Sequence, residues 1–344
     1  MKAPFVWFGG KRRVADVVWA ALGDVDNYVE PFAGSLAVLL ERPNPPRTET
    51  VNDADGFIAN FWRALAADPE AVAKHCDWPV NEVDLFARHL WLVNTGRSRL
   101  LEGMEADPEW FDPQIAGWWV WGINSWIGSG WCSGKGPWKH DAAGQGVKRQ
   151  RPHLGDAGQG VNRKRPHLGT AGQGVNRQRP HLGNPGVNNM EYRSNVLGYF
   201  EELAGRLRDV RVCCGDWSRV CTSGAMSYGS KVGVFLDPPY LGDVRTADLY
   251  AVDDHTISHA VRDWCLEHGD DPRLRIVLAG YRAEHDDLMP DTWRRHYYSA
   301  SVAYSTTESA ARQDGNHANR ASEVLWFSPH CVTPDRQGEL WEAL

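Results

Sequence analysis

The clearest chemical pattern in the sequence is Asp237–Pro238–Pro239–Tyr240, which directly follows the apolar segment Val232–Leu236. Two successive prolines donate no backbone N–H and hold the chain stiff, so their carbonyl oxygens remain acceptors. The Asp237 carboxylate and the Pro238 carbonyl would accept hydrogen bonds from a planar exocyclic amino group, and the Tyr240 ring offers a flat face for a base. The alternative is a proline-containing turn in which the aspartate is only a cap.

A second pattern lies near the amino terminus, where a turn of small residues follows a short strand. The expected strand Tyr28–Glu30 runs into Pro31–Phe32–Ala33–Gly34–Ser35. Thr48–Asn52 has the composition of another strand, with Asp53 at its carboxyl end. A carboxylate in that place suits the hydroxyl groups of a ribose in nucleotide-binding α/β proteins. Asp53 would alternatively be the N-cap of a helix expected at Gly56–Ala67, and the two roles are compatible.

The elements that must position these residues alternate as in an α/β protein, whose open sheet binds ligands at the carboxyl ends of its strands. Further helices are expected at Val14–Leu22, Leu36–Leu40, Asn195–Leu207 and Ile257–His268, and further strands at Val210–Cys213, Val232–Leu236, Arg275–Ala279 and Glu323–Phe327. We expect residues 1–67 to form the first α/β part and residues 191–344 the second. Residues 68–190 would form a helical, basic region between them.

Charge is distributed unevenly along the chain. The 344 residues have a net charge of −7, and the 42% hydrophobic content excludes wholesale disorder. Residues 131–183 hold ten basic and two acidic residues, a net charge of +8, so the rest of the chain carries −15. The acidic total therefore excludes a uniformly basic nucleic-acid binder, but it does not exclude a nucleic-acid substrate.

A 14-residue repeat runs through the basic segment. GQGVKRQRPHLG begins at Gly144, GQGVNRKRPHLG at Gly158 and GQGVNRQRPHLG at Gly172, so the three copies span residues 144–183. The repeat is too short and has too few copies for a solenoid, and its glycine and proline favour turns and extended pieces. We expect an insertion in a loop, for example a series of hairpins, that contacts phosphates. The alternative is a solvated insertion without a partner.

Cysteine, histidine and tryptophan give weaker indications. Seven cysteines in a chain of this length do not indicate a disulfide scaffold. Cys132, His140 and His153 lack the regular four-ligand spacing of structural zinc, so no metal is expected. Seven of the 17 tryptophans lie between Trp110 and Trp138, and most are expected in a helical core. No apolar run approaches the length of a membrane span, and the amino terminus does not have the pattern of a signal peptide, so we expect a cytoplasmic protein.

Several motifs, in this order, resemble the Dam-type DNA adenine-N6 methyltransferases. The resemblance covers roughly Phe5–Leu65 and Val196–Pro329. It is carried by Trp7–Phe8–Gly9–Gly10–Lys11, Glu30–Pro31–Phe32–Ala33–Gly34–Ser35, Asn52–Asp53, Gly215–Asp216–Trp217, Asp237–Pro238–Pro239–Tyr240 and the closing strand Ser322–Pro329.

The resemblance implies a doubly wound, mixed seven-stranded methyltransferase sheet that binds S-adenosylmethionine, yields S-adenosylhomocysteine and needs no metal. The implied cofactor residues are Trp7, Phe8, Gly9, Gly10, Lys11, Pro31, Phe32, Ala33, Gly34, Ser35, Asp53, Asp216, Trp217 and Asp237, and the implied catalytic residues are Asp237, Pro238, Pro239 and Tyr240. Lys11 taken alone would more simply be a solvated charge. The implied partner is double-stranded DNA, and the implied location is the cytoplasm of a bacterial cell or phage-infected host. By the same resemblance, residues 1–67 would bind the cofactor and residues 68–190 would form the target-recognition region.

The chain departs from the family in two places. Leu36 stands where the family often has glycine, and Trp121–Trp126 matches the family's recognition pattern only loosely. The residues expected to contact DNA are Asn124, Lys135, Lys139, Lys148, Arg149, Arg151, Arg163, Lys164, Arg165, Arg177 and Arg179. Methylation of cytosine N4, RNA adenine or a glutamine side chain is an alternative, and so is a DNA-binding module without activity. A dinucleotide oxidoreductase is disfavoured because no G-x-G-x-x-G motif follows Tyr28–Glu30.

Overall fold

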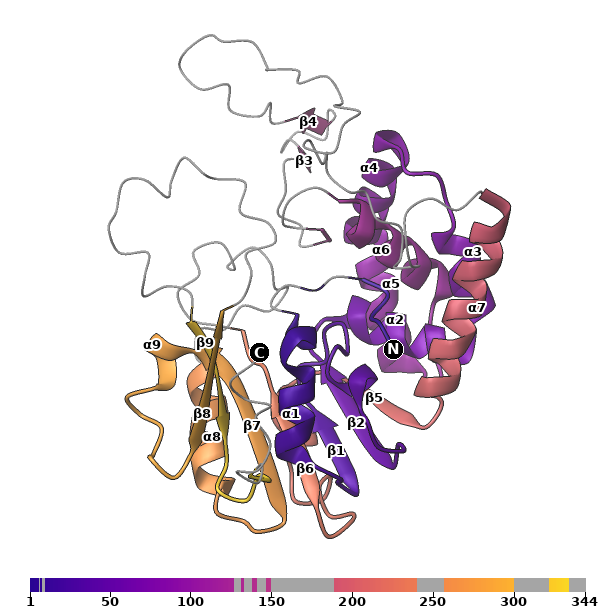
Figure 1. Ribbon diagram of the computed structural model, residues 1–344. Coiled ribbons are helices and arrows are strands. Elements are labelled where there is room, and N and C mark those ends of the chain that lie inside the picture. The colour runs from indigo at the N-terminus through magenta and orange to yellow at the C-terminus, as the bar shows by residue number, and fades with distance from the viewer. Residues whose placement is uncertain are drawn as a thin grey trace, which may run out of the picture.

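The structure is a computed structural model that describes residues 1–5, 7, 10–126, 131–132, 138–140, 147–149, 189–239, 257–299 and 322–333. For 138–140, 147–149 and 189–195 it describes the backbone alone. The chain forms a central sheet with helices on both faces, and a group of further helices packs beside it (Figure 1). This arrangement confirms the expected α/β class.

Seven strands make the sheet, in the order β5-β2-β1-β6-β7-β9-β8. Six of these strands run in the same direction, and β9 runs opposite to them, antiparallel to both β7 and β8. The strands are β1 (Asn27–Glu30), β2 (Thr48–Asp53), β5 (Val210–Cys214), β6 (Val232–Leu236), β7 (Leu274–Tyr281), β8 (Arg294–Ser299) and β9 (Ser322–Phe327). The expected mixed seven-stranded sheet of a methyltransferase is thus confirmed. Strands β2 and β5 lie on one side of β1, whereas β6 and β7, which come later in the chain, lie on its other side. The strand order therefore reverses between β1 and β6.

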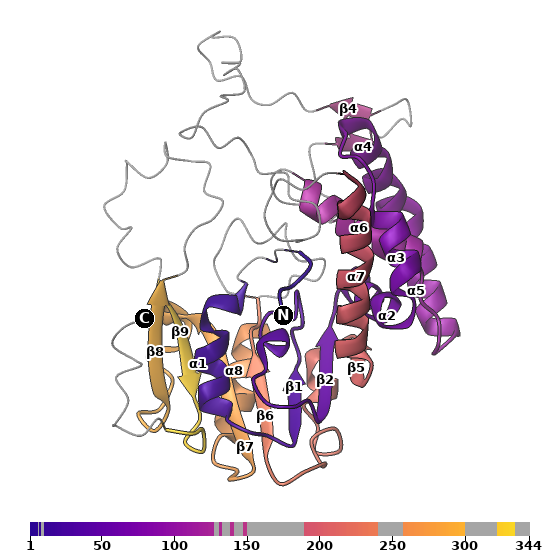
Figure 2. The same cartoon turned by 45° about the vertical axis from the view of Figure 1, so that its right-hand side comes forward.

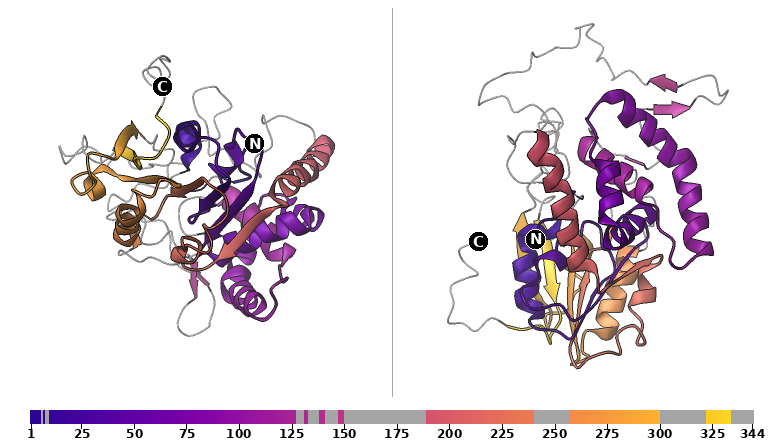
Figure 3. Two further views of the ribbon diagram at one scale, coloured as in Figure 1. Left: turned by 90° about the horizontal axis from the view of Figure 1, so that it is seen from below. Right: turned by 90° about the vertical axis from the view of Figure 1, so that its right-hand side faces the viewer.

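Helices cover the two faces of the sheet unequally. They are α1 (Ala15–Leu22), α2 (Gly56–Ala67), α3 (Pro69–Cys76), α4 (Glu82–Trp91), α5 (Arg97–Ala106), α6 (Pro113–Ser125), α7 (Asn189–Leu207), α8 (Ile257–His268) and α9 (Arg282–His285). Seen along the strands, α1 and α8 lie on opposite sides of the sheet (Figure 3). The view in Figure 2 shows α7 standing beside α2 and the end of the sheet that β5 forms.

Two apolar clusters correspond to these two faces. One joins α1, α2, α3, α6 and α7 to the sheet and contains the fully buried Trp62, Trp119 and Trp121. The other joins β6 and β7 to α8 and to the 3₁₀ turn Trp217–Val220. All five residues of β6 are buried, as expected for a central parallel strand covered on both faces.

The helices begin where short polar side chains accept their unpaired backbone N–H groups. The Asp55 carboxylate accepts from the Phe57 N–H at the start of α2, and the Asp112 carboxylate accepts from the Ile115 N–H at the start of α6. Pro69 occupies the first turn of α3, where the missing N–H is tolerated. Helix α2 has the bounds that the sequence predicted, but its cap is Asp55, so the expectation that Asp53 caps it is wrong.

The helix expected at Leu36–Leu40 is also wrong. Only a 3₁₀ turn, Leu39–Glu41, forms there, because the backbone first turns at Gly34 and Leu36, both with positive φ. Prolines at 43, 45 and 46 then prevent a helix from continuing. Strand β8 was not predicted from the sequence. Its charged and polar residues, Arg294–Ser299, are typical of an edge strand.

The helical group between β2 and β5 holds many of the tryptophans. Helices α4 and α5 are joined by a π-helical turn, Leu92–Gly96, and α3 and α6 pack against each other. Beyond them, β3 (Trp138–His140) and β4 (Val147–Arg149) form an antiparallel hairpin. Strand β4 lies within the first 14-residue repeat. No described helix is long and apolar enough to cross a membrane.

Candidate active site

The carboxyl ends of β1, β2, β5 and β6 bring the expected site residues together. We call this region the carboxyl end of the sheet. Parallel pairing aligns Asn52 and Asp53 of β2 with Cys213 and Cys214 of β5, and β1 lies between β2 and β6. The reversal of strand order between β1 and β6 places Asp237 and the turn after Glu30 at the crevice where ligands bind in such sheets.

Asp237 is held by a buried lysine. The Nζ atom of Lys11 lies 3.0 Å from Oδ1 of Asp237 and 3.3 Å from Oε2 of Glu323. The Lys11 side chain is only 3% exposed, so the alternative of a solvated charge is wrong. A cation at this distance stabilises the negative charge of the Asp237 carboxylate. The structure therefore connects the amino-terminal motif, the motif after β6 and the first residues of β9.

The turn after β1 is built around Gly34. Its φ of +45° suits glycine, and a Cβ atom there would lie 2.7 Å from Cδ1 of Trp7. The Gly34 N–H donates to Oδ2 of Asp53, at 2.9 Å, and its carbonyl accepts from Nε1 of Trp62, at 3.0 Å. The turn is thus fixed by β2, by α2 and by the amino-terminal segment.

Leu36 stands where the family that the sequence resembles often has glycine, and its backbone is in the left-handed conformation. Its φ is +56°, although its side chain is fully buried. The left-handed conformation costs a non-glycine residue roughly 1–2 kcal/mol. Burial of the leucine side chain offsets this backbone strain.

Asn52 joins three strands at this end of the sheet. Its side-chain Nδ2 atom donates to the carbonyls of Pro31, at 3.1 Å, and Gly215, at 3.0 Å. Its backbone carbonyl accepts from the Ala33 N–H. The side chain is 1% exposed, and its Oδ1 atom has no partner among the described residues. Sequence reasoning missed this role, because Asn52 was considered only as the neighbour of Asp53.

Asp53 accepts hydrogen bonds through both carboxylate oxygens. Oδ1 accepts from the Asp55 N–H and Oδ2 from the Gly34 N–H, each at 2.9 Å. Loss of water around the carboxylate, and then the charge of Asp55, raise the pKa of Asp53 to about 7. A carboxylate held in this way has its position set before any ligand arrives, and each oxygen has a further lone pair.

An aromatic pair lies near Asp53. The rings of Phe32 and Trp217 stack with centroids 6.3 Å apart and 26° between their planes, and Trp264 packs edge-on against Trp217. Asp216, the exposed residue before Trp217, caps the 3₁₀ turn through the Ser218 N–H. The two motifs that follow β1 and β5 therefore form one aromatic wall.

Glu30 is a buried carboxyl group that sequence reasoning assigned to a motif without giving it a role. It is 3% exposed, and its Oε2 atom accepts from the Tyr28 hydroxyl at 2.9 Å. Burial raises the pKa of Glu30 to about 8, and the negative charge of Asp237 adds to the rise. The signal available in the sequence was an acidic residue at the carboxyl end of an apolar strand.

The remaining expected residues are spread more widely. Pro238 is buried and Pro239 half-buried next to Asp237, while Phe8, Gly9 and Tyr240 lie outside the described residues. Lys139 pairs with Lys148 across the β3–β4 hairpin, and Trp138 pairs with Arg149. The other basic residues expected to contact DNA lie outside the described part: Lys135, Arg151, Arg163, Lys164, Arg165, Arg177 and Arg179. Asn124 donates to the carbonyls of Pro4 and Val120, so it links α6 to the amino-terminal segment.

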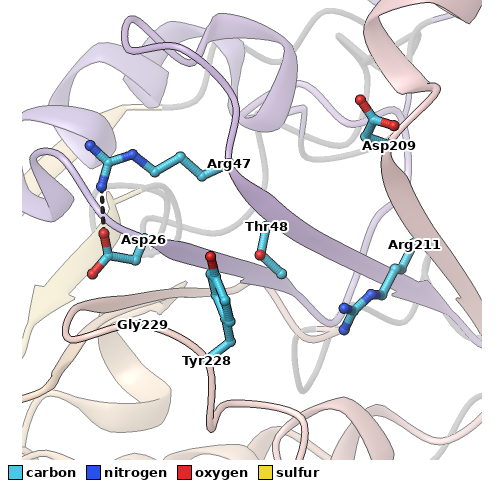
Figure 4. A pocket seen from close by; sticks show the side chains of 7 residues that line it. All are labelled: Asp26, Arg47, Thr48, Asp209, Arg211, Tyr228 and Gly229. Atoms are coloured by element: carbon cyan, nitrogen blue, oxygen red, sulfur yellow. Dashed lines mark hydrogen bonds and ion pairs between the residues drawn. The ribbon is translucent and has the colours of Figure 1, made fainter.

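An open groove lies at the opposite, amino end of the sheet (Figure 4). It has a volume of about 820 Å³. Its lining residues are Asp26, Arg47, Thr48, Asp209, Arg211, Tyr228 and Gly229. In Figure 4 Tyr228 and Thr48 stand between the Arg47–Asp26 pair and Arg211. None of the expected catalytic or cofactor residues lines this groove, and among the described residues no group of histidine, cysteine and acidic side chains could hold a metal ion.

One comparison with known proteins found a family that part of the chain matches. Residues 7–86 match the family model of the D12 class N6 adenine-specific DNA methyltransferases. The matched segment contains Lys11, the turn at Gly34 and Asp53, while Asp237 lies beyond it. No curated protein matches the chain.

Proposed function

We propose that this chain, an enzyme of the N6 adenine-specific DNA methyltransferase family, transfers a methyl group from S-adenosylmethionine to an adenine that has left the DNA duplex. The observation that carries the proposal is the pairing of Lys11 with Asp237 where the strand order reverses. This pairing joins a residue inside the segment that matches the family to the acceptor motif outside it.

The residues at the carboxyl end fit S-adenosylmethionine. The aromatic pair Phe32–Trp217 suits a planar adenine, and Asp53 presents acceptors for the ribose hydroxyls. The turn at Gly34 brings the backbone close, as the methionine part of the cofactor would require. Bound there, the cofactor supplies an electrophilic methyl group on a sulfonium. The carboxylates of Asp237 and Glu323 outnumber the ammonium of Lys11 between them, so the site favours a cationic ligand.

The target amino group would be held by Asp237 and Pro238. Both lie at the end of a strand buried on both faces, a place that a base stacked in a duplex cannot reach. The base must therefore leave the stack, and Tyr240 would provide the ring that replaces its neighbours. Hydrogen bonds from the N6 amino group to the Asp237 carboxylate and the Pro238 carbonyl would orient the nitrogen toward the methyl group.

Asp237 also provides the electrostatic part of the reaction. Positive charge develops on N6 as the carbon–nitrogen bond forms, and a carboxylate in a site that excludes water stabilises that charge. Lys11 keeps the carboxylate fixed by contact with Oδ1, so little reorganisation is needed during the reaction. The transfer is direct, and no protein nucleophile takes part.

The basic repeats are the best candidates for contact with phosphates. Residues 68–126, which form α3 to α6, hold ten acidic and four basic residues, so this helical group carries a net charge of −6 and would repel DNA. The adjoining segment 131–183 carries +8. Deletion of residues 144–183 is expected to weaken DNA binding and to reduce the slope of affinity against salt concentration. Unchanged affinity and slope would indicate a solvated insertion without a partner.

The methylated product separates the proposed function from its alternatives. The experiment incubates the protein with methyl-labelled S-adenosylmethionine and either DNA, RNA or a glutamine-containing protein, and identifies the labelled component after hydrolysis. Label in N6-methyldeoxyadenosine is expected. Label in N4-methylcytosine, RNA adenine or protein glutamine would show a different substrate, and binding of DNA without transfer would show a module that has lost activity.

A further inference from the structure

Asp237 is held by Lys11, and Lys11 is in turn held by Glu323 of the antiparallel strand β9. The Nζ atom of Lys11 lies 3.3 Å from Oε2 of Glu323, and the Glu323 side chain is 6% exposed. Because β9 runs against its neighbours, its first residues lie at the same end of the sheet as the last residues of the parallel strands. The closing strand thus delivers a carboxylate to the site.

Tyr298 completes the arrangement from β8. Its residue position pairs with Glu323 across the two strands, and its hydroxyl donates to Oε2 of Glu323 at 2.6 Å. The same oxygen therefore accepts a hydrogen bond from the Tyr298 hydroxyl and forms an ion pair with the Lys11 ammonium. These two contacts fix the glutamate side chain, and a fixed glutamate limits where the lysine ammonium can lie.

We propose that Glu323 is a positioning residue for methyl transfer, which acts through Lys11 on the orientation of the Asp237 carboxylate and is itself oriented by Tyr298. The proposal rests on the proposed function, because Asp237 must touch the reacting amino group. Its physical basis is that a buried lysine with one carboxylate partner can rotate about that partner, whereas contact with two carboxylates restricts its position. Without Glu323, Lys11 would also draw more strongly on Asp237 and compete with the amino group.

The chain contains a matched control for this arrangement on the other face of β8. The Tyr297 hydroxyl donates to Asp286, at 3.2 Å, and Asp286 is also paired with Arg282 and Arg295. This group, like the first, joins a tyrosine, a carboxylate and cations. It makes no contact with Asp237 among the described residues, and Tyr297 is 48% exposed. If Glu323 and Tyr298 contributed only to the stability of the fold, their substitution should affect the methylation rate no more than substitution of Asp286 and Tyr297.

The test compares single-turnover methylation rates and cofactor dissociation constants of Glu323→Gln, Tyr298→Phe, Asp286→Asn and Tyr297→Phe. Glu323→Gln should lower the rate on the order of 10- to 100-fold, while the cofactor dissociation constant stays within about threefold of wild type. Tyr298→Phe should lower the rate less, and the two control variants should keep the wild-type rate. A wild-type rate for Glu323→Gln, or an equal loss in Asp286→Asn, would overturn the proposal.

A double-mutant cycle with Lys11→Met tests the route of the effect. If Glu323 acts through Lys11, then Glu323→Gln should cause no further loss of rate in the Lys11→Met background. An equal loss in both backgrounds would show that Glu323 acts by another route. Each variant's rate is divided by the rate of the protein from which it was made, measured on the substrate that the wild-type protein methylates. If that substrate is not DNA adenine, the proposed function is refuted, but the rate ratios still test the role of Glu323.

Discussion

The two ends of the sheet both gather charged side chains, but they differ in burial and in how the charges are arranged. At the carboxyl end the side chains of Lys11 and Glu323 are 3% and 6% exposed, and they meet at Asp237. At the amino end Arg47 and Asp24 are 47% and 52% exposed and pair with each other. The groove of about 820 Å³ lies at the amino end, yet the expected chemistry lies at the other.

The difference teaches that the buried contacts of Lys11 with Asp237 and Glu323 indicate the site better than the groove in the surface does. Burying a lysine and several carboxylates is costly unless they serve one another or a ligand. The side chains of Arg47, Asp24 and Asp26 at the amino end stay partly exposed, and Asp26 holds a turn: its Oδ2 atom accepts from the N–H and hydroxyl of Ser230 and from the Lys231 N–H. Each prediction below sets a residue of one end against a counterpart at the other.

The largest effect on cofactor binding is expected at Asp53. Asp53→Ala removes the acceptors proposed for the ribose hydroxyls and should raise the dissociation constant of S-adenosylmethionine by about 10- to 100-fold, since hydrogen bonds to a charged group contribute roughly 1.5–3 kcal/mol. Asp26→Ala at the amino end should leave that constant unchanged. Titration calorimetry on both variants measures the contrast, and equal constants would contradict it.

Two buried asparagines offer a comparison of stability with binding. Asn52→Ala leaves the Pro31 and Gly215 carbonyls without their donor, so it should lower the free energy of unfolding by about 2–4 kcal/mol and weaken cofactor binding as well. The side-chain amide of Asn27, at the start of β1, donates to one carbonyl, that of Ala225, at 3.3 Å. Asn27→Ala should cost about 1–2 kcal/mol without a change in cofactor affinity. Denaturant unfolding together with calorimetry would reveal any failure of this separation.

The two ends should respond to pH in opposite directions. Burial raises the pKa of Glu30 from 4.5 to about 8, so the folded protein holds a proton there that the unfolded chain releases, and stability falls as pH rises from about 4.5 to 8. Hydrogen bonds from Ser230 lower the pKa of Asp26 from 3.8 to about 2, so its contribution is present above pH 4 and is lost as pH falls toward 2.

Substitution of Glu30 checks the first of these trends. Glu30→Gln keeps an acceptor for the Tyr28 hydroxyl and removes the ionisation, so it should raise the free energy of unfolding at pH 8 by on the order of 1–3 kcal/mol relative to wild type. At pH 5 the two proteins should be nearly equal. An Asp26→Asn variant should instead differ from wild type near neutral pH and converge with it in acid. Unfolding curves across this pH range measure both, and parallel curves for Glu30→Gln and wild type would contradict the raised pKa.

The smallest effect expected concerns the turn at Leu36. Both Leu36→Ala and Leu36→Gly lose a buried side chain, but glycine also relieves the positive φ of +56°. Leu36→Gly should therefore be more stable than Leu36→Ala by about 1 kcal/mol, the reverse of the usual order of these residues. Thermal unfolding of the pair measures the difference. The usual order, with alanine more stable, would show that the backbone at this position is unstrained.

The sequence predicted the fold well where periodicity and motifs agreed. The bounds of α2, β6 and α8 matched the structure because apolar spacing and flanking breakers defined them. It failed at Leu36–Leu40, where positive φ angles at Gly34 and Leu36 break a segment of helical composition, and at β8, whose run of polar and aromatic residues resembles a loop. It singled out Asp237, Lys11 and Asp53 through their motifs, and the structure brings Lys11 and Asp237 into contact. It missed the links made by Asn52, Glu323 and Tyr298, because contacts between distant strands are set by sheet order and leave no local pattern.

The most direct test of the account compares the two ends of the sheet in one assay of methyl transfer to DNA adenine. Equal amounts of wild type, Asp237→Ala and Asp26→Ala are incubated with methyl-labelled S-adenosylmethionine and DNA, and N6-methyldeoxyadenosine is measured, with cofactor binding checked in parallel. Asp237→Ala should lose at least about 10³-fold in rate while it still binds the cofactor, and Asp26→Ala should keep the wild-type rate. Normal methylation by Asp237→Ala, or a comparable loss in Asp26→Ala, would contradict the assignment of the reaction to the carboxyl end.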